Sequence, residues 1–247
     1  MFKPVIIVPC YNHADAFENQ ALHLVKIGLP VIVVDDGSLD KQSQKLKHIC
    51  AKNKFQYVYN YPNGGKGKAM KLGLKSALES DYTHALQIDA DGQHNVNDIK
   101  SFLDMAKKNP DCAIIGNPIY DTSAPFSRLL GRKITNFWVA LETMNFHMPD
   151  VMCGFRVYPL KITCDVIKYV YFNRMGFDIE VLVKLYWHGT DLIKKPTRVI
   201  YPKGGTSNFH VFKDNIYISL LHTYLCALCP LGLCKRFFYK HLSKGKR

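Results

Sequence analysis

The feature that most constrains the fold of this chain is a regular alternation of short apolar runs with segments of helical spacing. Residues 5–8 and 31–34 are uninterrupted apolar runs rich in β-branched side chains, as expected for strands buried on both faces. Between them, residues 14–27 have helical spacing and end at Gly28, a typical helix stop. Repeated strand–helix–strand units build a mostly parallel sheet that is covered by helices on both faces.

The same alternation continues along the chain. We expect helices over 40–52, 66–79 and 97–108, and strands over 55–59, 85–88 and 112–116. The second half is less regular, with helices over 128–144 and from Gly176, and a strand over 193–201 that Pro196 interrupts. The sequence therefore predicts an α/β, Rossmann-like fold. We expect one catalytic domain over residues 1–212 and a helical, basic, membrane-facing segment over 213–247.

Carboxylates follow one of the predicted strands as a closely spaced pair. Asp89 and Asp91 stand two residues apart, and residues two apart on a strand point to the same side. A divalent cation would remove the repulsion between two like charges, and oxygen ligands suit Mg²⁺ or Mn²⁺. The alternative is that both residues cap a turn or start a helix. Asn12, Asp35 and Asp36 also follow strand ends, where ligands bind in sheets of this kind.

Composition and charge point to a basic, folded protein that works on an anionic partner. The apolar fraction of 47% argues against disorder, and the formal net charge is +13. Most of the eight cysteines lie in apolar contexts with no secretory signal before them, which favours reduced thiols and a cytoplasmic location. No nucleic-acid-binding motif is present.

The C-terminus favours an anionic membrane surface as partner. Residues 216–234 are almost uncharged, and a basic cluster follows them. Pro230 and Gly232 interrupt the apolar run, so we expect a helix or hairpin in the interface of the membrane rather than a clean transmembrane helix. The alternative is an ordinary helix packed on the core. We therefore expect a peripheral protein at the inner face of the cytoplasmic membrane; the sequence gives no indication of oligomeric state.

Four motifs occur in a characteristic order: Pro9-Cys-Tyr-Asn12, Val34-Asp-Asp-Gly-Ser38, Asn63-Gly-Gly-Lys-Gly67 and Asp89-Ala-Asp-Gly-Gln93. In this order they resemble family 2 glycosyltransferases, and most of all the branch of dolichyl-phosphate mannose and glucose synthases. The resemblance covers nearly all of residues 3–212. It implies a GT-A fold, a nucleotide-sugar donor, a divalent metal and inversion at the sugar carbon.

The resemblance also implies a donor site and a metal site. Residues expected to contact the donor nucleotide are Pro9, Tyr11, Asn12, Asp35, Asp36, Lys66 and Asp89. The expected metal ligands are Asp91, Asp89 and Gln93, with the metal neutralising charge as the nucleoside diphosphate leaves. The helix that begins near Lys66 is expected to present free N–H groups to an anion.

The acceptor side is less defined by the sequence. Transfer to a hydroxyl needs a general base, for which Asp150, Asp178 and Glu180 are candidates, whereas a lipid phosphate is already anionic and needs none. The alternative role of Asp178 is to cap a helix, and that of Glu180 is to be a charge on a helix face. Arg156, in a Gly-Phe-Arg motif that resembles the family's acceptor loop, could pair with phosphate.

A glycine-rich loop from Lys203 to Ser207 also resembles a family loop near the active site, and Lys203 is a second candidate to bind the acceptor or its phosphate. Asn208 and Phe209 replace the usual ending of that loop, which favours bacterial relatives that act on other lipids over those that use polyprenyl phosphate.

The combined prediction is a metal-dependent inverting glycosyltransferase that moves a sugar from a UDP- or GDP-sugar to a lipid-linked or hydrophobic acceptor. Two alternatives are a catalytically silent nucleotide-sugar-binding or scaffold protein and a sugar nucleotidyltransferase. A nucleotidyltransferase would be expected to carry a Gly-x-Gly-Thr-Arg-type loop near the first strand, where this chain has Pro9-Cys-Tyr-Asn12.

Overall fold

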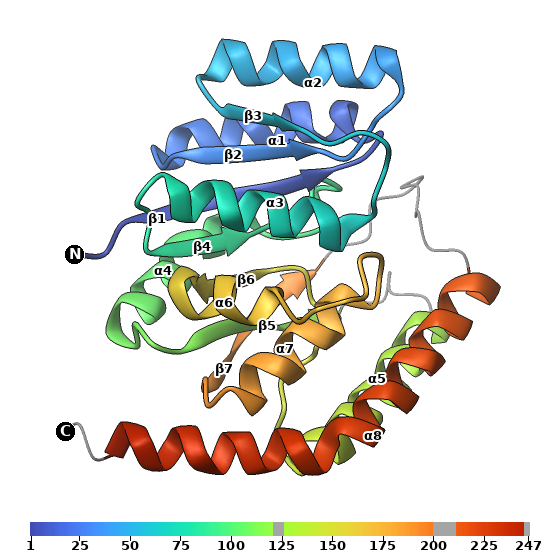
Figure 1. The fold of residues 1–247 in the computed structure, drawn as a ribbon. Coiled ribbons are helices and arrows are strands. Elements are labelled where there is room, and N and C mark those ends of the chain that lie inside the picture. The colour runs from blue at the N-terminus through green and yellow to red at the C-terminus, as the bar shows by residue number, and fades with distance from the viewer. Residues whose placement is uncertain (121–125, 200–210, 245–247) are drawn as a thin grey trace.

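The computed structural model describes residues 1–120, 126–199 and 211–244, and this part of the chain is built on a seven-stranded sheet (Figure 1). The strand order is β3-β2-β1-β4-β6-β5-β7. The strands are β1 (Pro4–Cys10), β2 (Val31–Asp35), β3 (Gln56–Tyr59), β4 (His84–Gln87), β5 (Ala113–Tyr120), β6 (Arg156–Pro159) and β7 (Leu192–Val199). Only β6 runs antiparallel to its neighbours β4 and β5. The predicted α/β fold with a mostly parallel sheet is confirmed.

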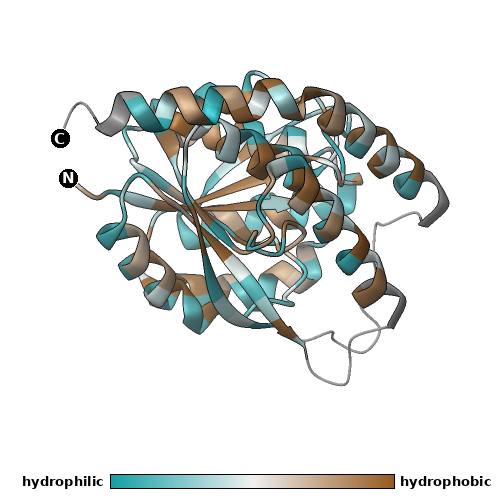
Figure 2. Ribbon diagram, turned by 90° about the horizontal axis from the view of Figure 1, so that it is seen from below, coloured by the Kyte–Doolittle hydropathy of each residue, from teal (hydrophilic) through white to brown (hydrophobic). Residues whose placement is uncertain are grey.

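Helices cover both faces of the sheet. They are α1 (Ala14–Ile27), α2 (Asp40–Asn53), α3 (Lys66–Glu79), α4 (Ile99–Lys108), α5 (Phe126–Thr143), α6 (Leu160–Ile167), α7 (Phe177–Trp187) and α8 (Val211–Lys244), with a 3₁₀ turn at Val96–Asp98. Alternate residues of β1 face different cores: Ile6 and Val8 pack with α1, α2 and α4, whereas Val5 and Ile7 pack with α3, α6 and α7. Figure 2 shows the hydrophobic residues concentrated along the strands between these layers.

The predicted boundaries hold best in the first half of the chain, where α1 and α3 begin and end at the expected residues. The predicted interruption at Pro196 is wrong, because β7 continues through it from Leu192 to Val199. The reason is that β7 stands at the edge of the described sheet, next to β5, so a missing N–H at Pro196 can be tolerated there. This pairing also carries β5 beyond Gly116 to Tyr120.

The C-terminal helix α8 is continuous, so Pro230 and Gly232 do not break it. It lies against α5 and α7, and Figure 1 shows it bending midway. Contacts before and after Pro230 hold it: His222 Nδ1 lies 2.6 Å from Glu142 Oε1 of α5, and a Cβ at Gly232 would collide with the ring of Trp187 in α7. Residues Asp214–His241 are long and apolar enough to cross a membrane, although 28% of the most apolar window is buried in the protein.

Candidate active site

The carboxylate of Asp35, at the end of β2, accepts its hydrogen bonds from groups of the protein itself. Asp35 is completely buried and accepts hydrogen bonds from Ser38 N (2.9 Å), Ser43 Oγ (2.6 Å) and Tyr57 OH (2.7 Å). These contacts fix the turn after β2 to α2 and β3. The predicted contact of Asp35 with the nucleotide stays a prediction, and the structure gives this side chain a supporting position.

Asp36 organises the glycine loop that precedes α3. Its carboxylate accepts hydrogen bonds from Gly64 N (3.0 Å), Gly65 N (2.6 Å), Asn60 Nδ2 (2.6 Å) and Asn63 Nδ2 (2.9 Å). Burial raises the pKa of Asp36 above its usual value, and these donors oppose that rise by stabilising the carboxylate. The turn after β2 and the glycine loop therefore form one unit at the carboxyl end of the sheet.

The loop after β1 joins the same unit. Asn12 adopts a left-handed conformation (φ 57°), its backbone N–H donates to Ser38 Oγ (2.9 Å) and its Oδ1 accepts from Leu39 N (2.8 Å). Pro9 is buried within β1, and Tyr11 is half-buried in the loop. Four predicted donor-site residues therefore lie close together at the ends of two adjacent strands: Tyr11 and Asn12 after β1, and Asp35 and Asp36 at the end of β2.

The start of α3 differs from the expectation of a free anion site. The N–H groups of Gly67 and Lys68 donate to the carbonyl oxygen of Asn173, at 2.7 and 3.3 Å. A Cβ at Gly67 would lie 2.5 Å from Phe177 Cβ, so glycine is needed for the segment before α7 to approach this closely. The prediction of free N–H groups here is wrong for these two residues, because a protein carbonyl already accepts from both.

A chain of buried and half-buried ion pairs crosses the site. Lys66 Nζ lies 2.9 Å from both carboxylate oxygens of Asp89 and 2.7 Å from Asp178 Oδ2. On its other side, Asp178 Oδ1 lies 3.3 Å from Arg156 Nη1 and accepts from Gln87 Nε2 at 3.3 Å. The structure therefore brings together four predicted site residues: Lys66, Asp89, Arg156 and Asp178.

Arg156 and Asp178 are enclosed in this chain of charges. Arg156 has no exposed surface, and its guanidinium donates to the carbonyls of Val151, Cys153 and Asp178. Burial by itself would raise the pKa of Asp178, but the charges of Lys66 and Arg156 outweigh it and hold that pKa below its usual value. In this geometry Arg156 is a support for Asp178, and no face of it is open to an acceptor phosphate.

Asp89 and Asp91 form the part of the site that could hold a metal. Oδ1 of Asp89 is buried and accepts no hydrogen bond, although it lies 2.9 Å from the Lys66 ammonium nitrogen. Burial, and then the charge of Asp89, raise the pKa of Asp91, whose Oδ1 accepts from Gln93 N at 3.0 Å. A bound cation would give Asp89 Oδ1 a further partner and would lower the pKa of Asp91.

Two carboxylates suffice for a Mg²⁺-type site in which water and a substrate diphosphate complete the shell. In the part of the chain that the structure describes, no group of three His, Cys, Asp or Glu side chains could hold a metal by itself. The donor set therefore fits a metal that is shared with a phosphorylated substrate.

The other two candidate bases are also engaged. Asp150 Oδ2 pairs with Arg132 Nη1 at 2.8 Å, and its Oδ1 accepts from Met152 N. Glu180 is completely buried and accepts from the backbone N–H groups of Tyr171 and Phe172. Lys203 lies outside the described residues.

Arg132 and Gly154 are neighbours of the site that sequence reasoning did not single out. A Cβ at Gly154 would collide with the Asp89 carboxylate, so this glycine lets the loop before β6 lie directly on Asp89. The sequence could have indicated Gly154, because it lies between Cys153 and Phe155 in the predicted acceptor loop. Arg132 lies within a predicted helix and gave none.

Comparison with known proteins decides the family. The family model described as "Glycosyl transferase family 2" matches residues 5–164. This chain belongs to that family. The glycosyltransferase predicted from the four ordered motifs is thereby confirmed, and the nucleotidyltransferase alternative is set aside.

Relatives and solved structures agree with this assignment. An uncharacterized protein of Methanocaldococcus jannaschii is 28% identical over 208 residues, covering 79% of this chain and 84% of that protein. The dolichyl-phosphate β-glucosyltransferase of Saccharomyces cerevisiae is 25% identical, covering 72% of this chain and 61% of the yeast protein. Glucosyl-3-phosphoglycerate synthase of Mycobacterium tuberculosis, solved with Mn²⁺ and UDP, shares the fold with a TM-score of 0.68 and 12% identity, covering 92% of this chain and 80% of that one.

Proposed function

We propose that this glycosyltransferase moves a sugar from a UDP- or GDP-sugar to the phosphate of a lipid at the inner face of the cytoplasmic membrane. The observation that carries the choice of acceptor is that none of the three candidate bases is free. Asp178 lies between two cations, Asp150 pairs with Arg132, and Glu180 is buried with Lys184 and backbone N–H groups as partners. A lipid phosphate is already a nucleophile and needs no base, whereas a hydroxyl acceptor does.

Similar proteins support a phosphorylated lipid acceptor. The yeast relative is named as a dolichyl-phosphate transferase. A Methanococcus voltae relative, 26% identical over 62% of this chain and 68% of its own length, is named as an N-acetylglucosaminyltransferase acting on dolichyl phosphate. The loop over residues 203–209, whose ending differs from the usual family sequence, lies outside the described part of the chain. We therefore propose a lipid phosphate as the class of acceptor and do not name the lipid.

On the donor side, we propose that Asp91 and Asp89 bind Mg²⁺ or Mn²⁺ together with the donor diphosphate, with Gln93 next to them. When bound, this metal would neutralise charge on the departing nucleoside diphosphate. Lys66 stands beside Asp89 and adds a fixed positive charge. Buried Asp178 holds Lys66 in place and is itself paired with buried Arg156.

We propose that the loops carrying Pro9, Tyr11, Asn12, Asp35 and Asp36 frame the nucleoside. The structure joins these loops through Ser38 and the glycine loop, so a nucleoside there would meet a preformed surface. The catalytic domain is proposed to span residues 1–212, with residues 213–247 as the segment that meets the membrane.

The experiment is a transfer assay with purified full-length protein and Mn²⁺. A panel of UDP- and GDP-sugars is offered with a short-chain isoprenyl phosphate, with the matching isoprenyl alcohol, or without acceptor. We expect nucleotide release that depends on the phosphate acceptor, on one donor and on the metal, and that is lost with EDTA and in D91A.

Transfer to the alcohol alone would contradict the proposed acceptor. Activity that is unchanged in D91A and in EDTA would contradict the proposed metal site.

A further inference from the structure

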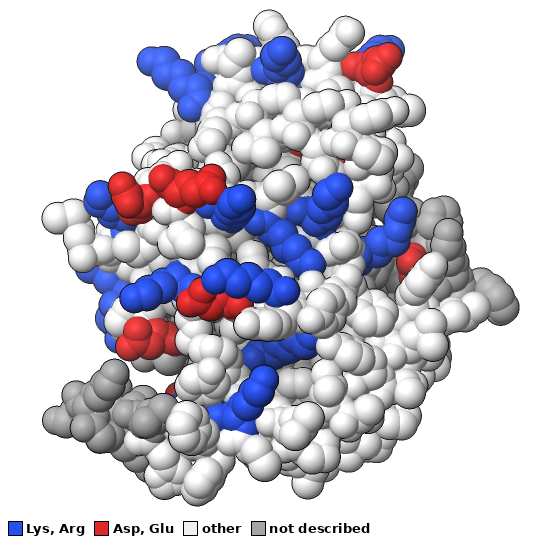
Figure 3. All heavy atoms as spheres, in the orientation of Figure 1, with Lys and Arg blue, Asp and Glu red and all other residues white. Residues whose placement is uncertain are grey.

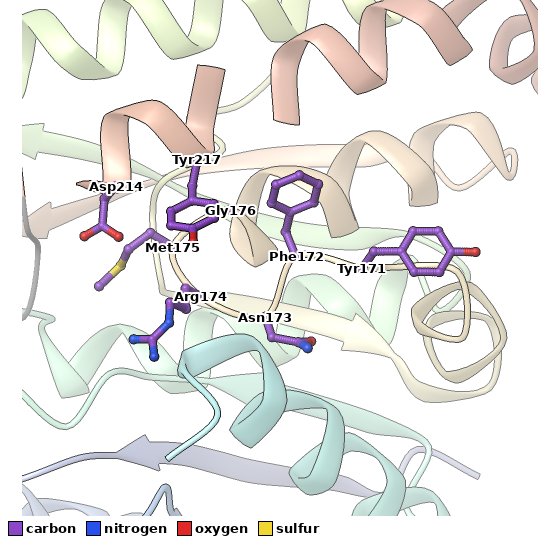
Figure 4. Close-up of a pocket in the computed structure, with 8 residues that line it drawn as sticks. All are labelled: Tyr171, Phe172, Asn173, Arg174, Met175, Gly176, Asp214 and Tyr217. Carbon is purple, nitrogen blue, oxygen red and sulfur yellow. The ribbon is translucent and has the colours of Figure 1, made fainter. Parts of the chain in front are cut away.

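A cavity of about 320 Å³ lies between the segment before α7 and the first turns of α8 (Figure 4). It is lined by Tyr171, Phe172, Asn173, Arg174, Met175, Gly176, Asp214 and Tyr217. None of these residues was assigned a role in the donor site. The cavity adjoins that site, because Asn173 accepts from the first N–H groups of α3, the helix that begins with Lys66.

The segment that forms the wall of the cavity is held from three directions. Glu180 accepts from Tyr171 N (2.9 Å) and Phe172 N (2.8 Å). Lys71 Nζ donates to the carbonyl of Val170 and to Asn173 Oδ1, both at 2.6 Å. Together with the bond from Gly67 to Asn173, these contacts fix the backbone before any ligand arrives.

Arg174 is the exposed cation of this fixed segment. A Cβ at Gly65 would lie 2.7 Å from Arg174 Cγ, so the side chain leaves the backbone next to the residue that precedes Lys66. Figure 4 shows its guanidinium turned away from α8, on the side of the segment that faces α3. Across the described ranges no ion pair or hydrogen bond of this guanidinium is found, whereas Arg132, Arg156 and Arg236 all have partners.

Apolar side chains make up much of the lining, with Phe172 and Met175 from the segment before α7 and Tyr217 from α8. In Figure 4 the rings of Phe172 and Tyr217 stand on either side of Gly176, with Met175 beside them. Leu220 and Ile216, which are 56% and 48% exposed, continue an apolar surface from Tyr217 along α8. Asp214 also lines the cavity, but it is only 6% exposed. The lining thus offers a charge for an anion at Arg174, on the side of α3, and an apolar surface for hydrocarbon at Phe172, Met175 and Tyr217.

We propose that Arg174 binds the phosphate of the lipid acceptor and that this cavity receives the first apolar units of its chain. A guanidinium can contact a phosphate through two parallel hydrogen bonds, and the position next to Gly65 would place that phosphate beside Lys66 and the donor site. The inference rests on the proposed lipid-phosphate acceptor. It identifies where on this chain that acceptor lies.

Binding is measured without donor sugar, so that it does not depend on turnover. Calorimetry compares citronellyl phosphate, citronellol and inorganic phosphate on the full-length protein. We expect citronellyl phosphate to bind at least about tenfold more tightly than either fragment, since only it can contact both the guanidinium and the apolar lining. R174A should raise the Kd for citronellyl phosphate about tenfold or more, with R174K in between, because lysine cannot form the paired contact.

Two further variants test the apolar lining and control for charge. Y217A should weaken binding of citronellyl phosphate and leave the weak binding of inorganic phosphate unchanged. K52A removes an exposed charge of α2, away from the cavity, and should leave every Kd within about twofold, a change too small to mark a direct contact. Unchanged thermal melting of each variant shows that the fold is intact, and R174Q replaces R174A if that variant does not fold.

The outcomes distinguish this inference from the proposed function. If the protein transfers sugar to a lipid phosphate but R174A and R174Q keep the wild-type Kd and KM for that acceptor, the inference is overturned and the function stands. If no phosphate acceptor is glycosylated, the proposed function fails. Loss of citronellyl phosphate binding in R174A would in that case still support a lipid-phosphate site.

Discussion

At the scale of single residues, the carboxylates of this site differ in whether the protein already supplies their partners. The carboxylates of Asp36 and Glu180 accept hydrogen bonds from backbone N–H groups and also contact neighbouring side chains, and that of Asp178 pairs with two cations. If one of these carboxylates were replaced, its buried donors would lose their acceptor at a cost in free energy. Each of these residues therefore stabilises the segment that carries its donors. Asp89 and Asp91 are the pair that keeps capacity for a cation.

The first residue-scale prediction concerns Gly154. In G154A the new Cβ would overlap the Asp89 carboxylate, so Asp89 or the loop before β6 must shift. We expect kcat/KM to fall about tenfold or more, which corresponds to roughly 1.4 kcal/mol of lost transition-state stabilisation. The measurement is steady-state transfer at saturating metal.

The matched control for G154A is G131A in α5, where a Cβ would meet nothing within 4 Å. Activity of G131A should stay within about twofold of wild type, and its stability should rise by roughly 0.5–1 kcal/mol. Equal activity of the two variants would contradict the role assigned to Gly154.

The second residue-scale prediction concerns Asp178. D178N leaves Lys66 and Arg156 without their shared counter-charge, and we expect a loss of about 3 kcal/mol in the free energy of unfolding at pH 7. The pKa of Asp178 is lower in the folded protein than its usual value. Its contribution is therefore present above about pH 4 and is lost as the pH falls through the folded-state pKa.

Urea unfolding between pH 3 and pH 7 measures this contribution. The wild-type stability should fall toward the acid end more steeply than that of D178N. Parallel pH profiles for the two proteins would show that Asp178 is not held ionised by its neighbours.

At the scale of elements, local spacing predicted helices and strands well where each element lies inside the α/β repeat. The apolar spacing of residues 14–27 and the glycines before Lys66 are local signals, and α1 and α3 follow them to the residue. Pro196 and Pro230 are local signals that tertiary contacts override. An unpaired edge accommodates the first, and packing of α8 on α5 and α7 holds the helix around the second.

The element-scale prediction concerns the attachment of α8. G232A places a methyl group against the ring of Trp187, and overpacking of this kind costs about 1–3 kcal/mol. We therefore expect the C-terminal half of α8 to detach more readily and its amide protons to exchange faster. Hydrogen exchange measured by mass spectrometry checks this.

L231A is the control for G232A, because Leu231 is 64% exposed and lies next to Gly232. Its exchange should match wild type. Faster exchange in L231A than in G232A would mean that contact with Trp187 does not hold α8.

At the scale of the whole molecule, charge and exposed apolar surface are separated. Figure 3 shows basic side chains across the face over α3, α6 and α7, while the region over the first half of α8 is nearly free of charge. In α5, Leu130, Ile134 and Phe137 are exposed at helical spacing. Two charges of the predicted basic C-terminus fold back, because Arg236 and Lys240 both pair with Asp191.

The whole-molecule prediction is preferential binding to anionic membranes. With a net charge of +13, the full-length protein should sediment with vesicles containing phosphatidylserine or phosphatidylglycerol more than with neutral vesicles. Added salt should weaken the electrostatic part and leave an apolar remainder.

F137D tests the apolar remainder, since it places a charge on the exposed face of α5. It should reduce binding that survives high salt, and L39D, on an exposed position before α2, should not. Binding that vanishes completely in salt would contradict an apolar membrane-facing surface.

The sequence by itself determined the α/β architecture, the order of motifs at the strand ends and the family, because strand and helix periodicity and turn residues are local properties of the chain. Only the tertiary structure decided what each site residue can contact. Lys66 meets Asp89 and Asp178, and Arg156 is sealed against Asp178, through pairs that lie far apart in sequence. The same distant packing encloses the candidate bases and leaves Arg174 exposed. Burial and charge pairing depend on which strands and helices become neighbours, and spacing along the chain does not encode that directly.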